Sequence, residues 1–180
     1  MARPTSCLLS RSALLRFSGD DAQLFLHNQL TCDIGALAAG RATYGAYCTP
    51  KGRMLATFLL WRSEQEFFMQ LPSPLRDPIQ RQLSKFILRS KVNVADASGD
   101  WTLFGVAGGD AATLVRHVIG QAPQAVHEVA RASDAMVLRL PGDRFEIVAA
   151  RDKTSQILED RKSTRLNSSH IQKSRMPSSA

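Results

Sequence analysis

Two predicted strands meet in the stretch Tyr44-Gly-Ala-Tyr-Cys-Thr-Pro-Lys-Gly-Arg-Met-Leu-Ala-Thr-Phe-Leu-Leu-Trp61. Between them, Pro50 fixes φ for a tight turn, and Gly52 permits the positive φ that follows it. The run after the turn, Met54 to Trp61, is almost wholly apolar, which predicts a strand buried on both faces. The stretch therefore predicts a hairpin around which the rest of the fold is organised.

The tip of this hairpin carries two cations, Lys51 and Arg53. A buried hairpin with a cationic tip can anchor an anionic ligand. Hairpin tips are also polar by default, because they are solvated. The turn alone leaves both interpretations open.

Two further blocks flank the hairpin, Gly19 to Asp33 before it and Leu83 to Asp96 after it. In chain order the three blocks contain G-x-D-A-x-x-F-L-x-x-Q-L-T-x-D, C-x-P-K-G-R-M and L-x-K-F-x-L-R-S-K-V-x-V. Together they resemble the YgfZ family. These folate-binding proteins are related to the glycine-cleavage T protein and are linked to iron–sulfur cluster maintenance and tRNA modification. The resemblance covers residues 8–159.

The resemblance implies an α+β fold of the T-protein type, with a mostly antiparallel sheet and packed helices. It implies tetrahydrofolate as the ligand, no metal, and iron–sulfur enzymes or assembly proteins as clients in the bacterial cytoplasm. The family's C-terminal signature, Lys-Gly-Cys followed by an aromatic residue and Gly-Gln-Glu, is missing, so no cysteine here inherits the role of the family's functional cysteine. We therefore expect residues 8–159 to be the N-terminal half of a folate-binding domain, a fragment that does not function alone.

Candidate folate contacts follow from the chemistry of the ligand. Its glutamyl tail is anionic, and the candidate partners are Lys51, Arg53 and Arg89. Its pterin ring needs flat apolar walls, for which the candidates are Tyr44, Tyr47 and Trp61. In some YgfZ proteins a Trp of the first strand contacts folate, and Ser12 stands at that position here.

An aminomethyltransferase like the T protein is the alternative enzyme function. In that protein, transfer depends on an acidic residue in the strand just after the hairpin tip. Here the run Arg53 to Trp61 contains no Asp or Glu. The resemblance therefore favours the YgfZ branch, and no local motif indicates another catalytic centre.

The last residues do not resemble a folded segment. Asp160 to His170 is, residue for residue, the translation of a common short-read sequencing adaptor, and Ser174 to Ala180 matches its continuation. We expect 160–180 to be a library artefact and exclude it from the fold. The alternative is a basic, Ser-rich disordered tail that binds nucleic acid.

The charge of the chain depends strongly on this tail. The net charge of +7 makes a basic RNA-binding module one candidate. Residues 160–180 hold five Lys or Arg and one Asp, so they supply +4 of that charge. Without the tail the charge is ordinary, and nucleic acid becomes a less favoured partner.

No apolar run approaches the length of a membrane helix, and three cysteines without metal-ligand spacing indicate reduced thiols.

Hydrophobic periodicity predicts alternating strands and helices with hairpin-like links, which favours a largely antiparallel α+β fold. The residues Leu75, Ile79, Leu83, Phe86 and Ile87 are spaced to face one core. The predicted elements beside the hairpin are strands over 14–17, 66–71, 90–95, 101–107, 135–140 and 145–150, and helices near 20–30, 75–87 and 111–119.

Overall fold

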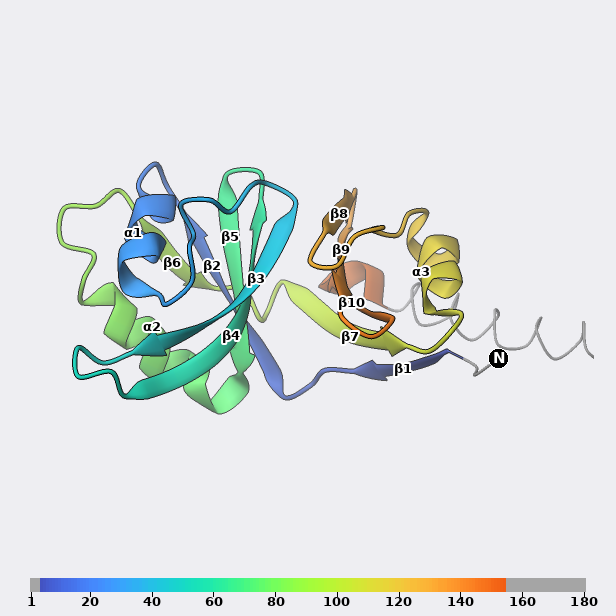
Figure 1. Ribbon diagram of the computed structural model, residues 1–180, viewed down its shortest axis with the longest axis horizontal. Coiled ribbons are helices and arrows are strands. Elements are labelled where there is room, and N and C mark those ends of the chain that lie inside the picture. The colour runs from blue at the N-terminus through green and yellow to red at the C-terminus, as the bar shows by residue number, and fades with distance from the viewer. Residues whose placement is uncertain (1–3, 155–180) are drawn as a thin grey trace, which may run out of the picture.

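The computed structural model describes residues 4–154, and the predicted tail lies outside them. Within these residues the chain forms two five-stranded antiparallel sheets and three α-helices (Figure 1), which confirms the α+β class. The first sheet has the order β3 (Arg41–Cys48), β4 (Met54–Ser63), β5 (Glu66–Pro72), β2 (Ser12–Ser18) and β6 (Asn93–Asp96). The second sheet has the order β1 (Thr5–Leu8), β7 (Trp101–Ala107), β10 (Arg144–Ala150), β9 (Ala135–Leu140) and β8 (Val129–Ala132).

The predicted hairpin is formed by β3 and β4. The N–H of Gly52 donates to the carbonyl of Thr49 at 2.8 Å and closes the turn. Gly52 has a φ of 78°, a conformation that glycine adopts without a Cβ clash. The turn chemistry expected from the sequence is confirmed.

Burial of β4 on both faces is limited to its second half. Phe58 to Trp61 are buried, whereas Met54 is 59% exposed and Leu55 is 36% exposed. The cause is the length of the neighbouring strand, since β5 pairs with β4 only over Leu59 to Ser63. The expectation of a wholly buried strand was therefore wrong for the residues nearest the turn.

Helices α1 (Ala22–Gln29) and α2 (Arg76–Ser84) cover one face of the first sheet (Figure 1). Ile79 and Leu83 are buried in that layer, as their spacing predicts. Phe86 is 43% exposed, so its predicted place in the core was wrong. The reason is that α2 ends at Ser84, before the helical periodicity of the sequence ends. No helix within residues 4–154 has both the length and the apolar character needed to cross a membrane.

The other face of the first sheet packs against the second sheet. Trp61 and Phe68 stack there with ring centroids 5.6 Å apart, beside Met136, Leu138 and Val148 of the second sheet. The far face of the second sheet is covered by α3 (Ala111–Ile119). In Figure 1 the order along the molecule is therefore α1 and α2, first sheet, second sheet and α3.

Strand β1 has no counterpart among the predicted elements. It pairs with β7, whereas the next strand, β2, lies in the first sheet. The turn between them is fixed by two backbone hydrogen bonds, Leu9 N–H to Leu103 at 2.9 Å and Ser12 N–H to Leu9 at 3.1 Å. The chain therefore passes from one sheet to the other within a few residues.

The two sheets also meet along their edges, where β3 begins beside β8. Residues Arg41 and Glu128 form an antiparallel bridge. The N–H of Ala42 donates to the carbonyl of His127 at 2.8 Å, and the N–H of Val129 donates to that of Gly40 at 2.8 Å. This contact continues the hydrogen-bonded backbone from the first sheet into the second.

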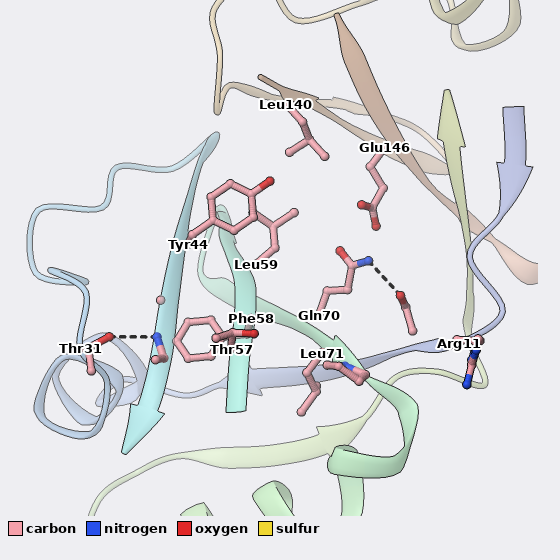
Figure 2. Close-up of a pocket in the computed structure, with 14 residues that line it drawn as sticks. Arg11, Thr31, Tyr44, Thr57, Phe58, Leu59, Gln70, Leu71, Leu140 and Glu146 are labelled. Carbon is pink, nitrogen blue, oxygen red and sulfur yellow. Dashed lines mark hydrogen bonds between the residues drawn. The ribbon is translucent and has the colours of Figure 1, made fainter. Parts of the chain in front are cut away.

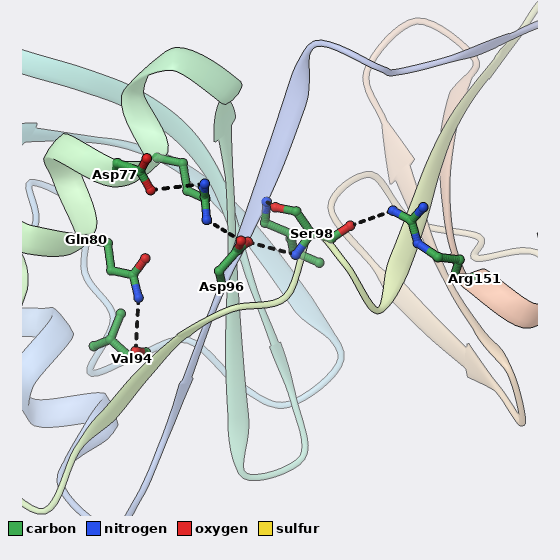
Figure 3. Close-up of polar contacts among 8 residues, drawn as sticks. Asp77, Gln80, Val94, Asp96, Ser98 and Arg151 are labelled. Atoms are coloured by element: carbon green, nitrogen blue, oxygen red, sulfur yellow. Dashed lines mark hydrogen bonds and ion pairs between the residues drawn. The ribbon is translucent and has the colours of Figure 1, made fainter.

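A polar clamp holds the connection from β6 to β7 (Figure 3). Asp96 pairs with Arg76 of α2 and accepts a hydrogen bond from the Ser98 N–H at 2.9 Å. The Ser98 hydroxyl accepts from the N–H of Leu14 in β2 at 3.0 Å. From the side of the second sheet, Arg151 donates to the carbonyls of Gly99 at 2.6 Å and Ser98 at 3.0 Å. The connection is thus tied to both sheets.

Candidate functional site

A cavity of about 830 Å³ opens where the first sheet faces the second. Its volume lies in the range of small-molecule and cofactor sites. Strands of both sheets supply its walls (Figure 2). The lining residues are Arg11, Ser12, Thr31, Tyr44, Gly45, Ala46, Thr57, Phe58, Leu59, Gln70, Leu71, Pro72, Leu140 and Glu146.

The most unusual group in the cavity is the carboxyl of Glu146. Side chains alternate along β10, so Phe145 and Ile147 pack against α3 while Glu146 points toward the first sheet. Glu146 is 4% exposed, and its Oε1 has no hydrogen-bond partner among the described residues. Burial raises the pKa of this carboxyl to about 8, against a smaller lowering effect of the Gln70 side chain.

Gln70 stands beside Glu146 on the opposite sheet (Figure 2). Its Nε2 donates to the hydroxyl of Ser12 at 3.3 Å, and its Oε1 has no partner among the described residues. Two buried acceptor oxygens therefore face the cavity without a protein donor from residues 4–154. Buried acceptors of this kind are costly unless a ligand or water satisfies them, so the geometry favours a ligand that brings N–H donors.

Tyr44 of β3 forms the aromatic wall of the cavity. Its side chain is 49% exposed and contacts the ring of His127 edge to face, with centroids 5.5 Å apart. His127 has a positive φ of 64° and a buried Nε2 without a partner in the described part of the chain. The contact limits the rotation of the Tyr44 ring, and about half of the side chain remains exposed for stacking against a flat ring.

Of the five folate contacts predicted from the sequence, the structure brings Tyr44 alone to the cavity. Tyr47 is 4% exposed in the core under α1 and α2, where burial raises the pKa of its hydroxyl. Lys51 and Arg53 are exposed at the hairpin turn, and Arg89 is exposed in the loop after α2. Their roles in binding remain predictions. Trp61, a further candidate wall, is fully buried between the sheets and donates to Met136 Sδ at 3.4 Å.

The block that ends in Thr31 and Asp33 contributes to the cavity through its first residue. Thr31 lines the cavity, and its hydroxyl accepts a hydrogen bond from the N–H of Ala46 at 2.9 Å. Asp33 instead accepts from the N–H of Ala36 at 3.1 Å and closes a turn. His27 accepts from the N–H of Gly35 at 3.2 Å, on the exposed side of α1. Residues 4–154 contain no group of three His, Cys, Asp or Glu side chains placed to hold a metal ion.

Sequence reasoning missed Glu146, Gln70 and Arg11. A signal for the first was present, since Glu146 is the single acid within the apolar run Phe145 to Ala150. An acid in such a run is buried on one face or breaks the strand, and a buried acid is a candidate functional group. Arg11 had no comparable signal, because it stands in a turn whose position depends on β1.

Comparison with known proteins places these features in context. The GCVT N-terminal domain matches residues 9–131. The tRNA-modifying protein YgfZ of Yersinia enterocolitica is 33% identical over 150 residues, which cover 82% of this chain and 45% of that protein. The protein of the same name from Sodalis glossinidius is 32% identical over 152 residues, with 82% and 46% covered.

Solved structures show the same fold. The glycine cleavage system aminomethyltransferase T of Bartonella henselae superposes with a TM-score of 0.80 at 19% identity, covering 89% of this chain and 45% of that protein. A chain of heterotetrameric sarcosine oxidase from Corynebacterium sp. U-96 superposes with a TM-score of 0.60 at 14% identity, covering 89% and 84%. The chain spans about half the length of the curated relatives it matches.

Proposed function

Because this chain belongs to the GCVT N-terminal domain family, we propose that residues 8–159 are the folate-binding half of a YgfZ-like protein. Tetrahydrofolate occupies the cavity between the two sheets. The whole protein, in the bacterial cytoplasm, supports tRNA modification and the assembly or repair of iron–sulfur clusters, and iron–sulfur enzymes or assembly proteins are its partners. The names of the Yersinia and Sodalis relatives, tRNA-modifying proteins, support the choice of this branch.

The observation that carries the ligand proposal is the unpartnered Glu146 in the cavity wall. One edge of a pterin presents an amino group and a ring N–H side by side. In its ionised form the Glu146 carboxyl accepts two such hydrogen bonds at once, and charge-assisted bonds of this kind are stronger than neutral ones. Because its raised pKa keeps the free group protonated at neutral pH, binding in this way displaces that proton. A pterin edge therefore satisfies the buried acceptor that the described part of the protein leaves open.

The remainder of the cavity suits the same ligand. Tyr44 offers a flat wall to the pterin ring, and Leu59, Leu71 and Leu140 supply apolar surface for the ring system that follows it. Tyr47, Lys51, Arg53 and Arg89 stand outside the lining. We retain them as predicted contacts that single substitutions will test.

Titration calorimetry of the 180-residue chain with tetrahydrofolate tests the proposal. We expect saturable binding that Glu146→Gln weakens by about tenfold or more, because the amide replaces one acceptor with a donor. Glu66→Gln, a change of the same chemistry in β5 outside the cavity, is the matched control and should leave the affinity unchanged. Absence of saturable binding by the unaltered chain at millimolar folate would contradict the ligand assignment.

Aminomethyl transfer is the second candidate function, and Glu146 is the observation that favours it, because a buried acid in the cavity can hold a proton. The strand that follows the hairpin tip, β4, lacks Asp and Glu over Met54–Ser63. We therefore expect no methylene-tetrahydrofolate from an aminomethyl donor. Production of methylene-tetrahydrofolate that is abolished by Glu146→Gln would establish the transferase instead.

A basic RNA-binding module is the third candidate, favoured by the net charge of +7. Truncation after Glu159 separates it from the tail. RNA affinity that survives truncation would support a binding surface on the folded part. Loss of affinity would assign RNA binding to residues 160–180, and this is the result we expect.

A further inference from the structure

The cavity is lined by one acidic and one basic side chain, Glu146 and Arg11, which are not paired with each other. Glu146 lies in its buried wall, and Arg11 lines it as an exposed side chain. Among residues 4–154, the guanidinium of Arg11 makes no ion pair and no hydrogen bond, whereas Arg76, Arg131 and Arg139 each contact an acid. Within the described part of the chain, Arg11 is thus a free cation at a cavity that already has a buried acceptor.

The backbone that carries Arg11 is fixed from two sides. Its carbonyl accepts a hydrogen bond from the N–H of Ser73, just after β5, at 2.9 Å. The neighbouring bond from Ser12 N–H to Leu9 closes the turn between β1 and β2. A cation on a fixed turn loses little backbone freedom when it binds an anion, because its position is already set.

We propose that Arg11 binds the anionic tail of the cavity's ligand, so that the tail extends toward Arg11 while the ring contacts Glu146 and Tyr44. Figure 2 shows Arg11 and Tyr44 on opposite sides of the view, with Glu146 and Gln70 between them. The inference rests on the proposed function and specifies the ligand class as a folate with glutamyl carboxylates. A guanidinium binds carboxylate through paired N–H donors, which a lysine does not reproduce.

This assignment competes with the cations predicted from the sequence. Lys51, Arg53 and Arg89 are exposed but do not line the cavity. A long polyglutamate tail could reach them, whereas the first glutamate of a bound folate lies close to the ring system. Arg11 is therefore the contact of the first glutamate, and the other three are candidates for later ones.

The experiment compares two ligands on three forms of the full chain. The ligands are tetrahydrofolate, which has a tail, and tetrahydropterin, which has none. The forms are the unaltered chain, Arg11→Gln, and Arg116→Gln as a control that removes one exposed positive charge of α3, outside the cavity. We expect Arg11→Gln to weaken tetrahydrofolate binding by about tenfold and to leave tetrahydropterin unchanged. Arg116→Gln should change neither affinity.

Three results would overturn the inference. Equal weakening of both ligands by Arg11→Gln would mean that the residue positions the cavity, and an unchanged tetrahydrofolate affinity would remove Arg11 from the site. An equal loss of tetrahydrofolate affinity with Arg116→Gln would mean that the effect of Arg11 comes from net charge and not from a contact with the tail. In each of these cases the unaltered chain still binds folate and the proposed function stands. If the unaltered chain binds neither ligand, the proposed function and the inference fail together.

Discussion

A Cβ atom placed on Gly45 would lie 2.5 Å from Sγ of Cys32. The same atom would lie 2.7 Å from the ring of Phe58, the residue opposite Gly45 in the β3–β4 ladder. The segment that follows α1, which contains Cys32, therefore packs so closely against β3 that position 45 has no room for a side chain. Thr31 and Ala46, which both line the cavity, are held together by the same close approach.

Gly45→Ala should destabilise the protein. The added methyl group overpacks the layer between α1 and the hairpin, at a cost of about 1–3 kcal/mol in the free energy of unfolding. Urea denaturation measures this cost. Gly99→Ala is the control, because no atom lies within 4 Å of the position that its added methyl group would take, and the change should be nearly neutral. The double variant Gly45→Ala with Cys32→Ala should lose less stability than the sum of the two single variants, because Cys32→Ala removes the Sγ atom that the added methyl group would meet.

Stability should fall as pH rises, through the carboxyl of Glu146. Its pKa is about 8 in the folded protein, above the ordinary 4.5, so the folded state binds more protons than the unfolded state between these values. The contribution is fully present below the unfolded pKa and is lost as pH rises through 8. Over that range it amounts to up to roughly 5 kcal/mol, and Glu146→Gln should abolish this part of the pH dependence.

The control for that measurement is an acid with the opposite shift. The N–H groups of Ala125 and Gln124 bond to Glu128 and hold the pKa of its carboxyl below the ordinary value. Its contribution is present above the unfolded pKa and is lost as pH falls through the folded pKa. Glu128→Gln should therefore lower stability at neutral pH and change the pH dependence of stability on the acid side alone. If both variants show the same dependence of stability on pH as the unaltered chain, the buried Glu146 carboxyl does not determine that dependence.

Folate binding should release a proton near neutral pH. The pterin edge brings two donors, so it binds the ionised form of Glu146, whose pKa is about 8 in the free protein. Affinity should rise by about tenfold per pH unit up to that pKa and level off above it. Calorimetry in buffers of different ionisation enthalpy counts the proton. A pH-independent affinity would show that Glu146 does not accept from the ligand.

Arg151→Ala should loosen the connection between the sheets. The change removes the hydrogen bonds to the carbonyls of Gly99 and Ser98, and we expect a loss of about 1 kcal/mol, because the guanidinium is largely exposed. Hydrogen exchange of the amides between Asp96 and Trp101 should accelerate. Asp152→Ala, its exposed neighbour, should change neither stability nor exchange.

The parts of the fold that follow from local chemistry could be predicted from the sequence. Pro50 and Gly52 specify their turn wherever the hairpin lies, and the strand Trp101–Ala107 is found at its predicted bounds. The failures involve partners distant in sequence. Phe86 has the spacing of a core residue, but the helix that would bury it ends first. Burial of Met54 depends on how far β5 extends.

The site was harder to predict for the same reason. Tyr44 could be proposed from the hairpin alone as an aromatic wall, but the sequence did not separate it from Tyr47 and Trp61. Glu146 becomes a cavity residue only when β10 pairs between β7 and β9 and faces Gln70 across the sheets. Arg11 reaches the cavity only because β1 joins the second sheet and the turn after it returns to the first. No single segment of sequence contains that information.

The pairing of β3 with β8 has a consequence for self-association. An unpaired edge strand offers its N–H and C=O groups to the edge of another molecule, which is a common route to aggregation. Here the hydrogen bonds of Ala42 and Val129 make the start of β3 and the neighbouring β8 segment satisfy each other within one chain. At this point the backbone groups of β3 and of the segment before β8 are already hydrogen-bonded to each other. A strand of another copy would have to displace these intramolecular bonds in order to add to either edge there.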